Sequence, residues 1–456
     1  MIKTVGLLCL VVACAVIAAA QEPSPSLPER LNGVPSKADL YLVNANLVDP
    51  AAREVRRSNL LIRDGRIASA PAKPPADFTG RTLDLGGKWV IPGLIDLHAH
   101  TYGNVDTSGT PIDRPNTPGV ALRMLYAGVT AFLDLFGNED ELFTWRQQQR
   151  QGVFGGADLF ASLTCLTATG AHGTEYGPKP RITDSPEQAR QAVESLKAKR
   201  PDVIKIIYDL GSGLRSMDKP TQLAAVSAAR QNGIKTVVHV SAWQGVRDAV
   251  EAGATAVTHV PGGPIPEDLA RLMAARTVAS IPTLAVQTDF RHFVLEPGVL
   301  DNPMARALTT AAVIGAYRSP ETVARAESQR QQREAFEASS FKSVKAMADA
   351  GVRILAGTDS GSVGTLQGYS LHRELIQMVA VGLTPWQAIA AATTDAAAFL
   401  GRNYGVKPGS EATLVVLEGS PIDDIRNTQR IAYVIHHGAV VDREALRASK
   451  VSGLTQ

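Results

Sequence analysis

Cysteine is scarce in this chain, and its scarcity excludes a fold held together by disulfides. Only 3 cysteines occur among 456 residues. Cys9 and Cys14 lie close to the N-terminus, which leaves Cys165 alone in the remainder of the chain. A lone cysteine cannot form an internal disulfide, so the fold must be stabilised by packing. Cys165 itself is expected to be a small buried apolar residue.

Net charge is also nearly absent. Lys and Arg together number 46 and Asp and Glu 44, which gives a formal net charge of +2. Nucleic-acid binding would require a basic face or stripe, so this balance offers no electrostatic argument for a nucleic-acid partner. With 45% hydrophobic and 20% charged residues, the composition is that of an ordinary globular protein. The length allows one large domain with a smaller companion.

Long apolar runs are confined to the N-terminus. Lys3 is followed by "TVGLLCLVVACAVIAAA" and then by polar "QEPSPS". This pattern predicts a signal peptide over residues 1–20 and therefore a periplasmic or secreted protein. A retained N-terminal anchor is one alternative, and "VVAC" ending at Cys14 weakly resembles a lipoprotein processing site, which is another. No later segment offers the ~20 apolar residues of a membrane span, so none is expected in the mature chain.

The two ends of the chain share one style of sequence. After a linker rich in proline and serine (21–37), residues 38–90 contain short alternating segments such as "NLLIRDGRIAS", separated by Asp-Gly and Gly-Gly. Residues 405–456 contain similar segments, "EATLVVLEG" and "IAYVIHHGAVVD". Such runs are typical of antiparallel strands joined by tight turns. We expect one small β-sandwich domain built from both chain ends.

The middle of the chain (91–404) alternates between short apolar runs and helical stretches. "SPEQARQAVESLKAKR" opens with a serine cap and a proline, and "SAWQGVRDAVEAG" closes on glycine, as helices do. Parallel strands need helical crossovers and form continuous apolar runs, so this α/β pattern predicts a (β/α)8 TIM barrel. The predicted barrel strands are residues 90–100, 130–135, 158–166, 202–209, 235–240, 255–260, 277–284 and 352–359.

Polar residues fall at informative places on these predicted strands. They are His98, His100, Lys205, His239, His259 and Asp359. The C-terminal strand ends of a (β/α)8 barrel converge on one face, where the active site forms, so these side chains are expected to meet. Imidazole nitrogen and carboxylate oxygen are suitable ligands for zinc and its neighbours. His98 and His100 lie two residues apart, so a strand directs both to the same side.

Lys205 is the unusual member of the set. A protonated lysine repels metals and is costly to bury unpaired. Burial and nearby cations lower its pKa, and a neutral amine can react with carbon dioxide to form a carbamate with two oxygens able to bridge two metals. We therefore hypothesise that Lys205 is carboxylated.

Each residue taken singly has a simpler interpretation. A histidine on an apolar strand is commonly structural, an aspartate after a strand commonly caps a helix, and a lysine often extends to solvent. The joint pattern favours a metal site. His372, His436 and His437 are assigned no role in it, and Arg291, His292, Arg306 and Arg318 are candidates for a substrate carboxylate that we expect to be solvated surface charges instead.

The motifs together resemble a known family. "VIPGLIDLHAH", followed by "VIKI", "VVHV", "VTHV" and "GTDSG", is similar to the amidohydrolase superfamily of metal-dependent hydrolases, and the resemblance covers nearly the whole mature chain. It implies two divalent metal ions, most simply zinc. By this resemblance His98, His100 and Asp359 hold the more buried ion, His239 and His259 hold the second, and carboxylated Lys205 bridges them.

The same resemblance extends to the reaction. "GAHGTEYG" is similar to subgroups that hydrolyse dipeptides and N-acyl amino acids, which implies that His172 binds or polarises the substrate carbonyl. Hydrolysis of an amide-type C–N bond in a small substrate is expected, cyclic amides included, with Asp359 as the general base. A mononuclear deaminase, an ester or lactone hydrolase and an inactive scaffold are the alternatives. A homo-oligomer is possible, but the sequence does not define the oligomeric state.

Overall fold

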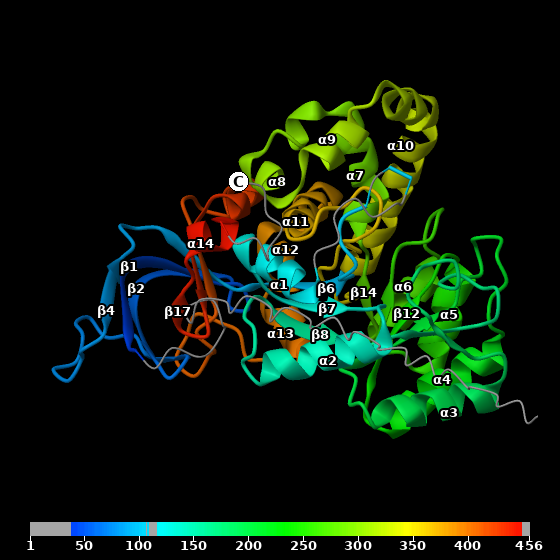
Figure 1. Cartoon of the computed structure of the whole chain (residues 1–456), viewed down its shortest axis with the longest axis horizontal. Coiled ribbons are helices and arrows are strands. Elements are labelled where there is room, and N and C mark those ends of the chain that lie inside the picture. Colours follow the sequence, from blue (N-terminus) through cyan, green and yellow to red (C-terminus); the bar gives the residue numbers. More distant parts are fainter. Residues whose placement is uncertain (1–37, 106, 109–115, 449–456) are drawn as a thin grey trace, which may run out of the picture.

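A computed structural model describes residues 38–105, 107–108 and 116–448 (Figure 1). The predicted signal peptide, Cys14 and the linker lie outside these residues. Within them, no helix is both long enough and apolar enough to cross a bilayer.

Strands from both ends of the described chain form one eight-stranded mixed sheet, at the left of Figure 1. Its order is β17-β16-β15-β5-β1-β2-β3, and β4 also pairs with β1. The bounds are β1 Leu40–Asp49, β2 Glu54–Arg63, β3 Arg66–Ser69, β4 Arg81–Asp84, β5 Trp89–Pro92, β15 Leu414–Leu417, β16 Ile431–His436 and β17 Ala439–Val440.

This sheet differs from the expected antiparallel sandwich because of the length of β1. One edge of β1 pairs antiparallel with β2. Its other edge pairs parallel with β4 along Leu40–Val43 and then with β5 at Asn46–Leu47. One long strand thus joins these segments in a single sheet.

The remaining strands form two parallel sheets. One has the order β6-β7-β8 and the other β10-β9-β11-β12-β13-β14. Their bounds are β6 Leu94–Ala99, β7 Val129–Asp134, β8 Asp158–Ala161, β9 Cys165–Thr167, β10 Arg181–Ile182, β11 Val203–Ile207, β12 Lys235–His239, β13 Ala256–Thr258 and β14 Ala279–Ile281.

Three of the predicted strands differ in the structure, and the first of them, 90–100, is divided at Gly93 into β5 of the mixed sheet and β6 of a parallel sheet. The segment 158–166 is divided into β8 and β9, and between them Leu163 has a left-handed backbone (φ 72°). The segment 352–359 is no regular strand, yet its backbone bonds to both parallel sheets. Leu355 N donates to Ser280 O (2.9 Å), and Leu97 N donates to Ala356 O (3.0 Å). This segment therefore lies between the β14 edge of one sheet and the β6 edge of the other.

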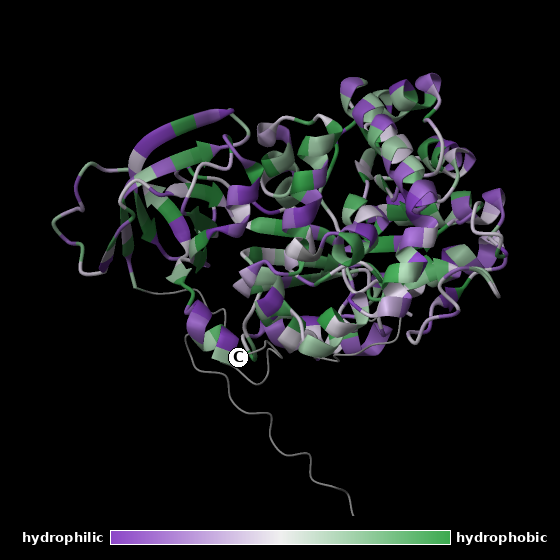
Figure 2. Ribbon diagram, turned by 90° about the horizontal axis from the view of Figure 1, so that it is seen from above, coloured by the Kyte–Doolittle hydropathy of each residue, from purple (hydrophilic) through white to green (hydrophobic). Residues whose placement is uncertain are grey.

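Helices surround the parallel strands, and Figure 2 shows hydrophobic residues concentrated on the strands between them. The α-helices are α1 Thr117–Tyr126, α2 Glu139–Arg150, α3 Pro186–Lys197, α4 Lys219–Gln231, α5 Trp243–Ala252, α6 Glu267–Ala275, α7 Leu284–Leu295, α8 Pro303–Leu308, α9 Ala311–Tyr317, α10 Pro320–Asp349, α11 Tyr369–Val381, α12 Pro385–Ala391, α13 Thr394–Leu400 and α14 Arg443–Ala448. Short 3-10 helices are η2 Pro297–Val299 and η3 Ile425–Gln429. The predicted serine cap of α3 is confirmed, since the Ser185 side chain accepts a hydrogen bond from Gln188 N.

Gly93 is the point at which the chain passes from the mixed sheet into the parallel strands. It separates β5 from β6, and its N–H donates to the Thr413 carbonyl at 2.8 Å. A Cβ atom at Gly93 would lie 2.3 Å from Thr130 Oγ1 and 2.7 Å from Thr413 Cγ2. No side chain fits there unless the two sheets move apart.

We expect Gly93→Ala to lower the free energy of unfolding by about 1–3 kcal/mol, because the new methyl group overpacks a fixed junction. Denaturant unfolding would measure the loss. Gly315→Ala is the matched control, since a Cβ at Gly315 in α9 meets no atom within 4 Å. Equal stability of the two variants would contradict this account of the junction.

Candidate active site

The structure brings together all six residues of the predicted metal site. His98 lies on β6, with His100 just after it, and Lys205 lies on β11. His239 ends β12, His259 follows β13, and Asp359 ends the 352–359 segment. Ring centroids are 5.1 Å apart for His98 and His259 and 4.5 Å for His259 and His239. Lys205 Nζ is 3.5 Å from His98 Nε2.

Hydrogen bonds fix which nitrogen of three rings faces the centre of the site. His98 Nδ1 lies 2.8 Å from Thr258 Oγ1, and that hydroxyl donates its own proton to the Ile281 carbonyl. The hydroxyl must therefore accept from the imidazole, which places the ring hydrogen on Nδ1.

The same arrangement holds for the other two rings. His259 Nδ1 donates to Thr283 Oγ1 at 2.8 Å, because the Thr283 hydroxyl donates to the Pro282 carbonyl. His100 Nδ1 donates to the Phe136 carbonyl at 3.1 Å. All three rings thus present an Nε2 lone pair for binding a metal, with the partner on Nδ1 that metal-bound histidines usually have.

The chemistry of this donor set fits a cation. Oδ1 of Asp359 lies 2.8 Å from His100 Nε2 and 3.3 Å from His98 Nε2. With the hydrogens on Nδ1, these three atoms are all acceptors and repel one another unless a positive charge lies among them. The Asp359 carboxylate raises the pKa of His100 above its ordinary value, although burial alone would lower it.

Burial tunes the other members of the cluster toward their neutral forms. Together with nearby cationic groups, it holds the pKa values of His98, His239 and His259 well below the ordinary value for histidine. Burial also lowers the pKa of Lys205 to about 8. Part of the lysine population therefore carries a nucleophilic amine near neutral pH.

His172 lies beside the cluster, on the loop that follows β9. Its ring centroid is 4.8 Å from that of His239, and its Nδ1 is 2.6 Å from Glu175 Oε1. Tyr176 packs at a steep angle against the same ring. His172 is therefore close enough to the site to contact a bound substrate.

Asp209 is a site residue that the sequence interpretation missed. One donor atom each from Asp209, His172 and His239 lie within 4.8 Å of one another. The Asp209 carboxylate accepts hydrogen bonds from Gly211 N and from the Ser241 hydroxyl. Its sequence position, directly after the apolar strand that carries Lys205, was the available signal.

Asp96 is the second missed residue, and its hydrogen bonds link two segments that carry residues of the site. It is completely buried and accepts hydrogen bonds from His98 N (3.1 Å), Thr358 N (3.0 Å) and Thr358 Oγ1 (2.6 Å). It thereby ties β6 to the residue that precedes Asp359. Burial raises the pKa of Asp96 to about 7. The alternation of a strand places Asp96 on the same face as His98 and His100, so the pattern was present in the sequence.

A pocket of about 760 Å³ opens above Asp359. Its apolar walls include Tyr102, Tyr176, Leu142 and Val286, while Asn138, Glu141 and Glu175 add polar groups. Tyr102 also stacks on the His100 ring, with centroids 5.0 Å apart. The size and mixed lining are typical of a site for a small molecule.

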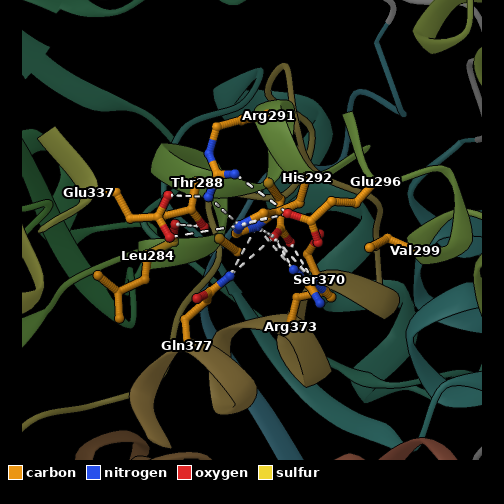
Figure 3. Close-up of polar contacts among 12 residues, drawn as sticks. Leu284, Thr288, Arg291, His292, Glu296, Val299, Glu337, Ser370, Arg373 and Gln377 are labelled. Carbon is orange, nitrogen blue, oxygen red and sulfur yellow. Dashed lines mark hydrogen bonds and ion pairs between the residues drawn. The ribbon is translucent and has the colours of Figure 1, made fainter. Parts of the chain in front are cut away.

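The charged residues between 285 and 349 that were candidates for a substrate carboxylate do not line this pocket. Arg291 and His292 were expected to be solvated, but their side chains are only 14% and 9% exposed. They join a polar cluster with Asp289, Glu337 and Arg373 that ties α7 to α10 and α11 (Figure 3). Two more arginines of the insert pair with Asp301 rather than with the site, namely Arg306 and Arg318.

His372 is buried away from the pocket. Its Nε2 lies 2.9 Å from the Ala127 carbonyl, and its Nδ1 lies 3.1 Å from Thr428 Oγ1. These contacts give it the structural position expected from the sequence.

Comparisons with known proteins identify the family to which the chain belongs. Residues 89–441 match the amidohydrolase family. Ochratoxinase from Aspergillus niger is 26% identical over 463 aligned residues, which cover 88% of this chain and 85% of that protein.

Solved structures show the same fold. The crystal structure of a Xaa-Pro dipeptidase with bound methionine superposes with a TM-score of 0.71 at 22% identity, covering 88% of this chain and 99% of that one. The A. niger ochratoxinase structure gives a TM-score of 0.67 at 23% identity, covering 89% and 96%. The chain belongs to the amidohydrolase family, and it is a hydrolase that acts on carbon–nitrogen bonds.

Proposed function

We propose that this amidohydrolase holds two divalent metal ions, zinc in the simplest case, and cleaves an amide bond in a small substrate. Dipeptides, N-acyl amino acids and cyclic amides are the proposed substrate classes. The observation that carries the proposal is the convergence of histidine lone pairs on the Asp359 carboxylate at the floor of the pocket. The superfamily generally uses divalent metals, and a dipeptidase is among the structural relatives.

The proposed ligands divide between the two ions. His98, His100 and Asp359 hold one ion, and one donor atom from each of them lies within 4.8 Å of the others. His239 and His259 hold the second. Carboxylated Lys205 bridges both, a role supported by its burial and by the 3.5 Å between its Nζ and His98 Nε2.

The proposed architecture around the ions is a closed (β/α)8 barrel. The three-stranded and six-stranded parallel sheets supply most of its wall, and the backbone of the 352–359 segment is hydrogen-bonded to both sheets. In such a barrel the C-terminal strand ends form the active face, which is where these residues lie.

The chemistry then follows from the positions of the side chains. Bound divalent ions supply Lewis acidity that polarises a carbonyl and lowers the pKa of water. Asp359 accepts a proton from the water that attacks the carbonyl carbon and returns it to the leaving nitrogen as the C–N bond breaks. His172, whose ring is hydrogen-bonded to Glu175, contacts the substrate carbonyl, and the pocket above Asp359 holds the rest of the substrate.

Asp359→Asn should lower kcat by about 10²–10⁴-fold, because the amide cannot accept the proton. Steady-state kinetics and metal analysis of the same samples would measure both effects. His98→Asn is the control, and we expect it to lose more metal than Asp359→Asn. Near-wild-type turnover by Asp359→Asn would overturn the general-base assignment.

Lys205→Ala should lose metal and activity together, because the bridging carbamate cannot form. Lys205→Arg, which keeps a cation of similar length, should behave in the same way. Metal-free wild-type protein should take up metal more completely when bicarbonate is added. A Lys205→Ala variant with full metal content and activity would contradict the proposal.

A substrate screen with chelator controls would test the reaction itself. We expect the metal-loaded protein to hydrolyse dipeptides, N-acyl amino acids or cyclic amides and to lose this activity on chelation. Ammonia release from a heterocycle would indicate the deaminase alternative, and turnover of lactones alone would indicate an ester hydrolase. No turnover of any class by fully metal-loaded protein would favour an inactive scaffold.

A further inference from the structure

A second cluster of metal-binding side chains lies far from the candidate active site. It consists of Asp158, the first residue of β8, and His436 and His437 at the end of β16. His98 and His100 lie at the C-terminal end of β6, and β6, β7 and β8 run parallel. The cluster is therefore at the opposite end of the parallel strands, where the mixed sheet meets them.

The three side chains converge on one point. The two imidazole centroids are 4.0 Å apart, and the Nε2 atoms of His437 and His436 lie 2.8 and 3.4 Å from Asp158 Oδ1. Ligand atoms around a tetrahedral ion with bonds of about 2.0–2.1 Å lie about 3.3 Å apart. The two nitrogen–oxygen separations differ from this spacing by no more than about 0.5 Å, and the three ligand atoms lie within 4.8 Å of one another.

His436 is the residue that hydrogen bonding leaves unexplained. It is 3% exposed, and although its Nε2 lies 3.4 Å from Asp158 Oδ1, neither ring nitrogen makes a hydrogen bond of good geometry within the described part of the chain. Buried polar groups are nearly always satisfied. Hydrogen bonds of Asp158 with His437 and Arg402 account for the polar groups of the cluster other than the His436 imidazole.

The backbone at His437 is held in an unusual conformation. His437 has a φ of 49° and is followed by Gly438 with a φ of 81°. Successive residues of a strand point to opposite faces, and a left-handed residue breaks that alternation. The turn therefore allows adjacent histidines to face the same carboxylate, at the cost of a conformation that residues other than glycine rarely adopt.

The surrounding charges are suited to a cation. Arg402 donates to Asp158 Oδ2 at 3.0 Å and also pairs with Glu411, so Oδ1 is left for the histidines. Asp158, Glu411 and Arg402 together carry one net negative charge. Two pockets of about 320 and 260 Å³, both lined by His437 and Arg402, give access from solvent.

We propose that Asp158, His436 and His437 bind one transition-metal ion of the zinc, nickel or copper class at a site separate from the active site. Two imidazole nitrogens and one carboxylate oxygen suit this class and disfavour calcium and magnesium. Water from the adjoining pocket completes the coordination. The ion ties the β16–β17 hairpin to the start of β8 and so stabilises the contact between the mixed sheet and the parallel strands.

Zinc content of the full-length enzyme tests the site. His437→Asn is the informative variant, because asparagine tolerates a left-handed backbone and preserves the turn. After equilibration with zinc and dialysis, we expect His437→Asn and His436→Gln each to contain one zinc fewer per chain than the wild type. Their hydrolysis rates should equal that of the wild type, and zinc should raise their Tm less.

Equal zinc content in the wild type and both variants would overturn the proposal. A fall in hydrolysis rate together with the lost zinc would also contradict it, because the site would not be separate. If both variants fail to fold, anomalous scattering at the zinc edge from zinc-loaded wild-type crystals decides the question. A peak between Asp158 and the two histidines supports the site, and its absence while the active-site cluster is occupied refutes it.

Discussion

The hydrogen bonding of Nδ1 in three imidazoles, those of His98, His100 and His259, is the constraint on which the candidate active site depends. It fixes the tautomer and the ring direction, so that Nε2 lone pairs face one small volume. The partners belong to other parts of the fold: the Thr258 hydroxyl at the end of β13 orients a ring on β6, and Thr283 orients the ring of His259. Each of these three rings is thus oriented by a strand or loop other than its own. A shift of one strand against another would release the rings before any ligand residue was lost.

The candidate active site lowers the free energy of unfolding of the protein, and packing in the surrounding structure must offset this cost. His259, Thr283 and Asp359 all have left-handed backbones, with φ values of 72°, 50° and 60°. Strain of this kind costs on the order of 1–3 kcal/mol for each residue and is commonly found at functional sites. The burial of Asp96 and Lys205 adds a further cost. The large apolar core between strands and helices is what makes the arrangement tolerable.

The sequence predicted which side chains cluster at the candidate site because regular strand geometry determines their positions. The two-residue spacing of His98 and His100 and the positions of polar residues at strand ends follow from strand periodicity alone. Asp96 was within reach of the same reasoning, since it shares their face. Thr258 and Thr283 were not, because a threonine at a strand end has no distinctive pattern. Their function exists only when two strands distant in sequence become neighbours.

The fold was harder to predict where the pairing of strands, rather than the local conformation of each segment, determines the structure. Alternating residues correctly indicated strands at both chain ends, yet nothing in the alternation showed that β1 would pair on both edges along its length. The prediction that Arg291 and His292 are solvated was wrong for a related reason. The side chains that bury them come from α10 and α11, which are distant in sequence from their own helix, α7.

The C-terminal ends of the parallel strands carry the candidate site, and the N-terminal ends contact the mixed sheet. The side chains of the site can be positioned only if the N-terminal ends are fixed, which explains why the mixed sheet is needed. The junction at Gly93 does this for β6, because its N–H bonds to Thr413 of the mixed sheet and no space remains for movement. Arg402 does the same for β8 by bonding to Asp158. Since β6 carries His98 a few residues beyond Gly93, the register set at the mixed sheet is carried directly to the proposed metal ligands.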